Sequence, residues 1–188
     1  MKYKVYPTLL NLYARFEKGL VSEQELLDRI NRVPVPQTEA QAKGVSFENA
    51  VLKGTNEDLF DPHVIIKSRT LLPKPLTATQ VYCESLIGEV LFYGFVDVLG
   101  QCMAADLKST RTYTPCKFAE DHQNLYLPAL SKRGISTLRY IVTDFSDVYF
   151  EDYSLDSDFS LQYKQIAAFV DFLEAHRKQI IDRRIFAC

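Results

Sequence analysis

The order of hydrophobic and polar positions along the chain predicts that helices and strands interleave. Helical spacing or helix-start signals mark five stretches, at residues 7–17, 22–32, 38–52, 118–131 and 159–183. Strand-forming residues mark six others, at residues 64–69, 79–87, 90–99, 102–108, 137–143 and 148–153. This pattern predicts a mixed fold in which helices cover a sheet.

Capping boxes fix two helix starts in the first third of the chain. Ser22 with Glu25 forms one box, and Thr38 with Gln41 forms the other. The proline-containing stretch 33–37 joins the two helices as a stiff link. We expect a single domain, residues 1–188, divided into an N-terminal helical segment (1–37), a core (38–153) and a C-terminal helix (154–188).

Residues 92–108 predict a β-hairpin. Gly100 and Gln101, at its centre, have the Gly-X form of a two-residue type II′ turn. With this turn, Asp97 on the first strand lies opposite Ala104 on the second. A loop of odd length would instead place Asp97 on the other face of the hairpin.

The hairpin gathers three charged side chains. Because side chains alternate along a strand, Asp106 and Lys108 share the face of Asp97. The two aspartates are then diagonal neighbours, roughly 7–8 Å apart. Two carboxylates at that separation suit one shared divalent cation, and the amine points into the same space.

An Asp-x-Lys sequence on a strand is usually part of a solvated face. Here the surrounding residues are apolar and describe a strand pair that is covered on both sides. They are Val96, Val98, Leu99, Met103, Ala104, Ala105 and Leu107. Charged side chains in such a place need partners or a metal.

Glu48 falls in the middle of the helix predicted for residues 38–52. Its neighbours three and four positions away include Val45 and Val51, so this carboxylate interrupts the apolar stripe. A structural salt bridge is one explanation, and a bound cation is the other. Gly44 on the same helix would let it approach another backbone closely.

The helix predicted for residues 118–131 places Gln123 and Tyr126 on the same side as core leucines, so Tyr126 serves either packing or substrate contact. The preceding polar loop, residues 108–117, carries Arg111 and Lys117. Such a loop can hold a phosphate backbone, although solvated loops often have this composition too.

Glu84 is a lesser candidate ligand. It shares the sheet face of Asp97 if Gly88 and Glu89 form a tight turn.

The length and composition of the chain restrict the classes of protein to which it can belong. A chain of 188 residues that is 47% hydrophobic can bury a sizeable core but is too short to carry a helicase motor as well. The sequence has no P-loop pattern, no signal peptide and no apolar run of membrane length, which predicts a cytoplasmic protein. With a net charge of −2, the surface as a whole is not basic, so nucleic acid would have to bind in a local positive groove.

The motifs described above resemble those of the PD-(D/E)XK nuclease superfamily, most closely its RecB-like exonuclease branch, which includes small phage-type nucleases. The resemblance covers roughly residues 40–150. It rests on helical Glu48, on Asp97 in Gly-Phe-Val-Asp, on Asp106-Leu-Lys108, and on Gln123 with Tyr126. It implies a restriction-endonuclease-like core, αβββαβ, with an antiparallel meander in a mixed central sheet flanked by helices.

The resemblance also implies roles. Glu48, Asp97 and Asp106, with the Leu107 carbonyl, would bind Mg²⁺ or Mn²⁺. Lys108 would activate or orient the attacking water, and Gln123 would help to position substrate. Gln123 and Tyr126 are three positions apart, where the branch usually has four. The four cysteines, Cys83, Cys102, Cys116 and Cys188, are scattered without a Cys-x-x-Cys, so no iron-sulfur cluster is expected.

The resulting expectation is a metal-dependent deoxyribonuclease, acting as an exonuclease in recombination, repair or phage DNA processing. Two alternatives stay open: a catalytically silent module of the same fold that binds nucleic acid or a partner, and a structure-specific endonuclease. DNA is the expected partner, and a recombinase, helicase or single-strand-binding protein is a plausible second one.

Overall fold

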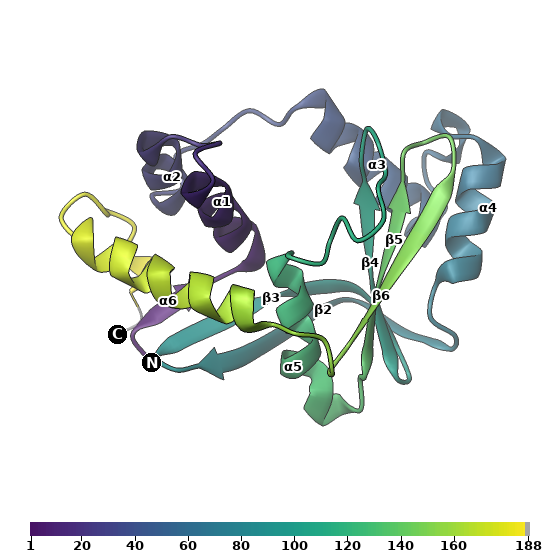
Figure 1. Cartoon of the computed structure of the whole chain (residues 1–188). Coiled ribbons are helices and arrows are strands. Elements are labelled where there is room, and N and C mark those ends of the chain that lie inside the picture. Colours follow the sequence, from purple (N-terminus) through teal and green to yellow (C-terminus); the bar gives the residue numbers. More distant parts are fainter. Residues whose placement is uncertain (187–188) are drawn as a thin grey trace.

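The structure, a computed structural model, describes residues 1–186 and is built on a six-stranded mixed sheet (Figure 1). The strands are β1 (Tyr3–Val5), β2 (Leu76–Ile87), β3 (Val90–Gly100), β4 (Met103–Ser109), β5 (Thr137–Thr143) and β6 (Val148–Ser154). Their order is β1-β3-β4-β5-β6, with β2 paired to β3. The β1–β3 and β4–β5 pairs are parallel and the others antiparallel. The predicted restriction-endonuclease-like α+β core, with its antiparallel meander β2–β4, is confirmed.

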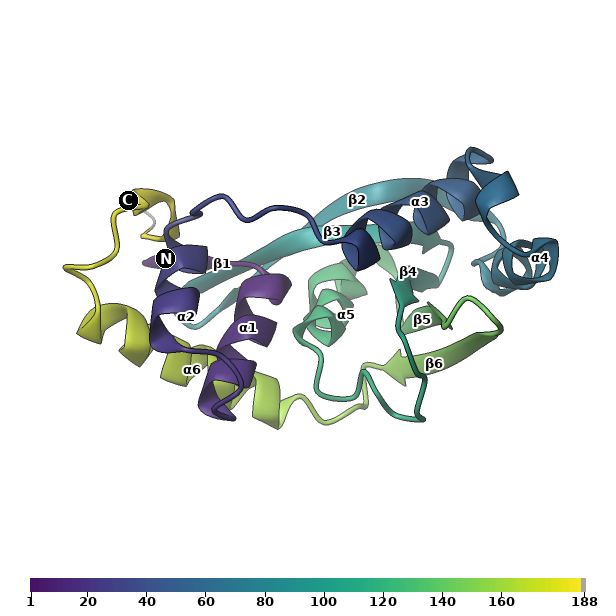
Figure 2. The ribbon, with the colours of Figure 1, turned by 90° about the horizontal axis from the view of Figure 1, so that it is seen from above.

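Six α-helices flank this sheet in the described part of the chain. They are α1 (Pro7–Glu17), α2 (Glu23–Ile30), α3 (Glu39–Lys53), α4 (Pro62–Leu71), α5 (Tyr126–Leu130) and α6 (Ser160–Ala175). Helices α1, α2 and α6 gather at the end of the sheet that holds β1, and α3 and α4 lie at the end that holds β4–β6 (Figures 1 and 2). No helix among residues 1–186 is both long and apolar enough to cross a membrane.

Strand β3 has a different neighbour at each end of one edge. Along its other edge, β2 pairs with it over almost its whole length. On the first edge, β1 pairs only with Val90–Phe92, and β4 pairs only with Val98 and Leu99. Residues 93–97 therefore have no strand partner on that edge. We call the point where β4 leaves β3, next to Asp97, the fork.

The connection between β3 and β4 is longer than predicted. Leu99 pairs with Ala104, so the two-residue turn at Gly100 and Gln101 is wrong and four residues form the loop. Gly100 cannot occupy a turn position because it still belongs to β3 and pairs with Leu76 on β2. The register shifts by two positions, an even number, so the shift by itself does not change which residues of β3 and β4 share a face.

Residues 64–69, predicted as a strand, lie within α4. The Asp61 side chain accepts the N–H of His63 at 2.8 Å, and Pro62 occupies the first helical position. Buried Val64, Ile65 and Ser68 recur at helical spacing. A short run of β-branched residues does not distinguish a strand from a helix, and the Asp-Pro start decides the question here.

Two other predicted helices are shorter than expected. In place of a continuous helix over 118–131, a 3₁₀ turn spans His122–Leu125 and α5 follows it. Pro128 explains the break, because a proline inside a longer helix would clash with the carbonyl of Asn124, whereas it is tolerated in a first turn. Helix α6 ends at Ala175, not near residue 183.

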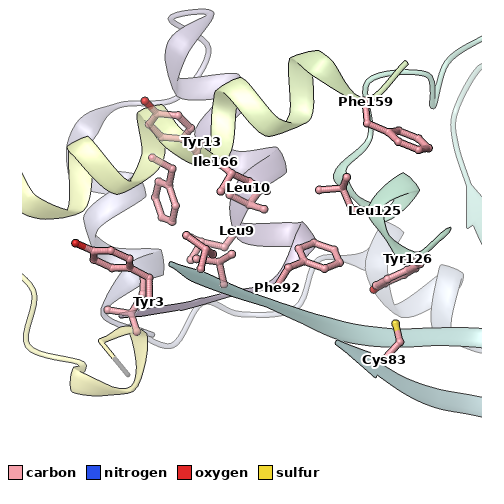
Figure 3. Close-up of a cluster of buried hydrophobic side chains, with 14 of the residues drawn as sticks. Tyr3, Leu9, Leu10, Tyr13, Cys83, Phe92, Leu125, Tyr126, Phe159 and Ile166 are labelled. Carbon is pink, nitrogen blue, oxygen red and sulfur yellow. The ribbon is translucent and has the colours of Figure 1, made fainter. Parts of the chain in front are cut away.

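Two hydrophobic cores lie on opposite sides of the sheet. The larger joins α1, α2, α5 and α6 to β1–β5, and Figure 3 shows Leu10 of α1 and Phe92 of β3 in it. The smaller joins α3 and α4 to the same sheet around Phe47. Neighbouring residues of β4 alternate between the two, with Ala104 in the larger core and Ala105 in the smaller.

The approach of Tyr126 to β3 generates a stability prediction. A Cβ at Gly94 would lie 2.5 Å from the Tyr126 hydroxyl oxygen. We expect Gly94→Ala to lower the free energy of unfolding by about 1–3 kcal/mol in urea titrations, as overpacking does. In a Tyr126→Ala background the same substitution should lower it much less. An equal effect in both backgrounds would contradict this packing.

Candidate active site

Asp97 lies at the fork, where its carboxylate is held from two directions. One oxygen, Oδ2, accepts the backbone N–H of Leu107 on β4 at 2.8 Å. The other, Oδ1, accepts the side-chain amide N–H of Gln80 on β2 at 3.0 Å. The side chain therefore spans the place where β3 and β4 separate.

The regular alternation of β3 changes at Asp97. Val96 packs in the larger core and Val98 in the smaller one, although residues two apart on a regular strand share a face. Gln80, opposite Asp97 on β2, has a φ of 52°, a left-handed conformation that is uncommon outside glycine. Such irregular backbone is frequent at functional sites.

Asp106 is the most buried charge of the group, with 1% of its surface exposed. Its Oδ2 forms an ion pair with the ammonium of Lys108, and its Oδ1 accepts the Gln123 amide at 3.1 Å. The Lys108 Nζ also lies 5.9 Å from the ring centroid of Tyr140. The predicted grouping of Asp106, Lys108 and Gln123 is thus present as a hydrogen-bonded unit.

Glu48 reaches the same place from α3. Its Oε1 accepts the Gln80 amide N–H at 2.9 Å, so one amide group bridges Glu48 and Asp97. The sequence interpretation missed Gln80. The signal was available, because the tight turn at Gly88 and Glu89 that pairs Ile87 with Val90 also sets Gln80 opposite Asp97.

Burial raises the pKa of the Glu48, Asp97 and Asp106 carboxyl groups above their ordinary values. The positive charge of Lys108 opposes this rise at both aspartates, and the charge of Asp106 adds to it at Glu48. Burial alone would lower the pKa of Lys108, but the surrounding carboxylates, Asp106 first, raise it overall. Lys108 is therefore an ammonium at neutral pH.

The carboxylates of Glu48, Asp97 and Asp106 are chemically suited to bind a hard cation. Within residues 1–186 no three acidic, histidine or cysteine side chains are close enough to form a metal site as they stand. Glu48 and Asp97 nevertheless each direct an oxygen at the side-chain NH₂ group of Gln80, so the two oxygens point at one place that a cation would also favour. Carboxylate oxygens are typical ligands of Mg²⁺ and Mn²⁺. Asp106 is turned toward Lys108 and Gln123.

An open pocket of about 580 Å³ lies beside these charges. One face of α3 lines it with residues at helical spacing, and Lys108 lines it from β4. The residues of that face are Gln41, Gly44, Val45 and Glu48. A Cβ at Gly44 would lie 2.9 Å from the Ser109 Oγ, so this glycine leaves room for a side chain of β4, whereas the sequence predicted close approach to a backbone.

A second pocket of about 470 Å³ adjoins the first at Ala40 and Ser109. Two cations, Lys43 and Arg111, and two carboxylates, Glu39 and Asp144, line it next to the first turn of α3. Lys117 does not extend into it, because its ammonium donates to the Thr112 carbonyl of its own loop at 2.7 Å. Of the two basic loop residues, only Arg111 lines a pocket next to the site.

Two further candidates lie away from the carboxylates. Tyr126 is 3% exposed, and its ring lies 5.9 Å from that of Phe92, so it belongs to the core. Glu84 shares the face of Gln80 but is exposed, four positions further along β2 and about 13 Å away at 3.3 Å per residue. Its carboxylate accepts the Tyr82 hydroxyl.

Comparisons with solved structures agree on the fold. A candidate exonuclease from Eubacterium rectale superposes with a TM-score of 0.63, over 95% of this chain and 83% of its own, at 9% sequence identity. The protein SSO0001 superposes with a TM-score of 0.52, over 94% of this chain and 79% of its own, at 14% identity. No family model and no curated protein matches the sequence. At such identities the likeness shows the fold alone.

The Gln80 bridge makes a prediction for the titration of the site. Its amide lowers the pKa of both Glu48 and Asp97, so Gln80→Ala should raise the titration midpoints of both carboxyl groups. Carboxyl ¹³C NMR of the metal-free protein measures this shift. Thr79→Ala, an exposed neighbour, serves as the control and should leave both midpoints in place. Unchanged midpoints in Gln80→Ala would refute the bridge.

Proposed function

We propose that this protein is a metal-dependent deoxyribonuclease of the RecB-like type that acts as an exonuclease. The observation that carries the proposal is the convergence of Asp97, Asp106 and Lys108 at the fork with Glu48 from α3. The restriction-endonuclease-like core and the superposition on a candidate exonuclease support it. The proposed setting is recombination, repair or phage DNA processing.

Glu48, Asp97, Asp106 and the Leu107 carbonyl are the proposed ligands of Mg²⁺ or Mn²⁺. A cation of this kind would lower the pKa of a bound water and neutralise charge on the phosphate. In the metal-free protein the Gln80 amide holds two of the carboxylates together, which keeps the ligands near one another. Gln80 is thus a positioning residue.

Lys108 acts through its positive charge. Because its pKa is raised, it is a poor proton acceptor, and it instead stabilises negative charge on the attacking oxygen or on the phosphate. Its ion pair with Asp106 holds the ammonium at the edge of the pocket. Gln123 orients Asp106 through its amide and in this way positions a ligand instead of the substrate.

The second pocket gives the DNA backbone a place next to the site. Lys43 and Arg111 supply positive charge there, which Glu39 and Asp144 partly offset, and the positive end of the α3 dipole lies next to it. A negatively charged phosphate is favoured at such a position.

The first experiment is cleavage of end-labelled linear duplex, linear single-stranded and covalently closed circular DNA with Mg²⁺ or Mn²⁺. Asp97→Asn and Lys108→Met should each reduce the rate by about 10²-fold or more, and EDTA should abolish it. Glu89→Gln removes an exposed carboxylate outside the site and should cleave normally. Nicking of the circle would reassign the protein as an endonuclease.

If the folded wild-type protein binds DNA but cleaves none of these substrates, the protein is a catalytically silent binding module. Cleavage that EDTA does not affect would refute the proposed dependence on metal. A recombinase, helicase or single-strand-binding protein remains the proposed type of partner, because such a protein could unwind DNA or load it onto the site.

Metal binding should stabilise the protein in a pH-dependent way. A carboxyl group whose pKa is raised on folding contributes stability below its unfolded pKa and loses it as the pH rises through the folded value. For Asp106 this window runs from an ordinary value near 4 to about 7. Protons and metal therefore compete for the same oxygens.

We expect Mn²⁺ at about 100 times its Kd to raise Tm by roughly 5–10 °C at pH 8, and by much less at pH 5. Thermal melts at each pH, with Mn²⁺ and with EDTA, give the rise in Tm that the metal causes. Groups that titrate without binding metal, such as His122, affect both melts equally and drop out of the difference. Asp97→Asn should lose the shift at both values. A shift that does not vary with pH would contradict proton competition.

A further inference from the structure

The face of β2 and β3 that lies opposite the larger core carries exposed aromatic side chains. Phe95 is 52% exposed and Tyr82 is 37% exposed. The two residues pair across the strands, and their ring centroids are 5.4 Å apart in an edge-on arrangement. Large aromatic residues usually bury such area, so an exposed pair suggests a binding role.

The aromatic surface continues away from the pair along the same face. The ring of Tyr93, two positions before Phe95, lies 6.5 Å from that of Tyr82. The ring of Tyr6, which also packs against the larger core, lies 6.0 Å from that of Tyr93. These four side chains form a row that we call the aromatic row: Phe95, Tyr82, Tyr93 and Tyr6.

One end of the aromatic row meets the candidate active site. Tyr82 is two positions from Gln80 on β2, and Phe95 is two positions from Asp97 on β3. At 3.3 Å per residue the row starts about 7 Å from the carboxylates. A ligand lying on the row would thus extend directly into the site.

Two cations lie over rings of the row. The Lys4 ammonium lies 4.8 Å from the ring centroid of Tyr93, and the Arg32 guanidinium lies 6.0 Å from that of Tyr6. The opposing charges are already engaged, because Glu84 accepts the Tyr82 hydroxyl and Asp182 forms an ion pair with Arg32 at 2.8 Å. Rings interleaved with cations match the bases and phosphates of a nucleic acid strand.

We infer that the aromatic row binds single-stranded DNA by stacking on unpaired bases and leads the strand end to the carboxylates. This inference rests on the proposed nuclease function and specifies its substrate. Bases inside a duplex are stacked on one another and cannot stack on these rings, so the surface selects a single strand. Stacking tolerates any base, which suits a nuclease without sequence preference.

The test is the binding of a fluorescein-labelled oligothymidylate, followed by anisotropy in EDTA so that the strand is not cleaved. We expect Phe95→Ala to weaken binding about tenfold and Phe95→Ala with Tyr82→Ala to weaken it further. Phe95→Trp keeps a stacking surface and should bind like the wild type. Phe150→Ala, which removes a Phe that is 51% exposed on β6, is the matched control and should also bind normally.

Wild-type affinity in the double alanine variant would overturn the inference, as would equal weakening by Phe150→Ala. A further contrary result would be a wild-type dimer that dissociates in Phe95→Ala by size-exclusion chromatography, because a second copy of the chain would then occupy the face. Since binding is measured without metal, loss of binding in the double variant supports the row even if the wild type cleaves no DNA. In that case the nuclease proposal alone fails.

Discussion

The hydrogen bond from the backbone N–H of Leu107 to the Asp97 carboxylate is the contact on which the site depends. Strands β3 and β4 pair through only two residues, after which β4 pairs in parallel with β5 over its whole length. At the fork the N–H of Leu107 therefore finds a side chain as its acceptor. The same bond holds the carboxylate in the opening between the strands, where Gln80 and α3 reach it.

The site also concentrates negative charge at a place where burial disfavours it. Three carboxyl groups have raised pKa values, and only Lys108 supplies a full positive charge in direct contact with one of them. Such an arrangement lowers the stability of the folded chain at neutral pH unless a cation joins it. The two cores on either side of the sheet supply the stability that permits it. A site that folding alone disfavours is typical of one that a ligand completes.

The sequence predicted which carboxylates come together better than it predicted the connections between strands. The turn between Asp97 and Asp106 was predicted wrongly, and the alternation of β3 changes at Asp97. The two carboxyl groups still meet at the fork, where the charge of Asp97 raises the pKa of Asp106. The strand expected over 64–69 failed, since a short apolar run has no period of its own and the helix start at Asp61 outweighed it. Gln80 was missed because a neutral amide on a strand carries no chemical signal until strand pairing places it.

The two surfaces next to the carboxylates differ in chemistry, and together they define a path for a substrate. Glu48 and Lys43 are five positions apart on α3, about 7–8 Å along its axis, so the second pocket lies directly beside the carboxylates. The aromatic row runs from the carboxylates along β2 and β3. Bases held on the rings would thus bring the bond to be cleaved to the carboxylates, and Lys43 and Arg111 would hold a phosphate next to them. A duplex end has to open before its bases can stack on the rings, so the geometry favours ends that are already single-stranded.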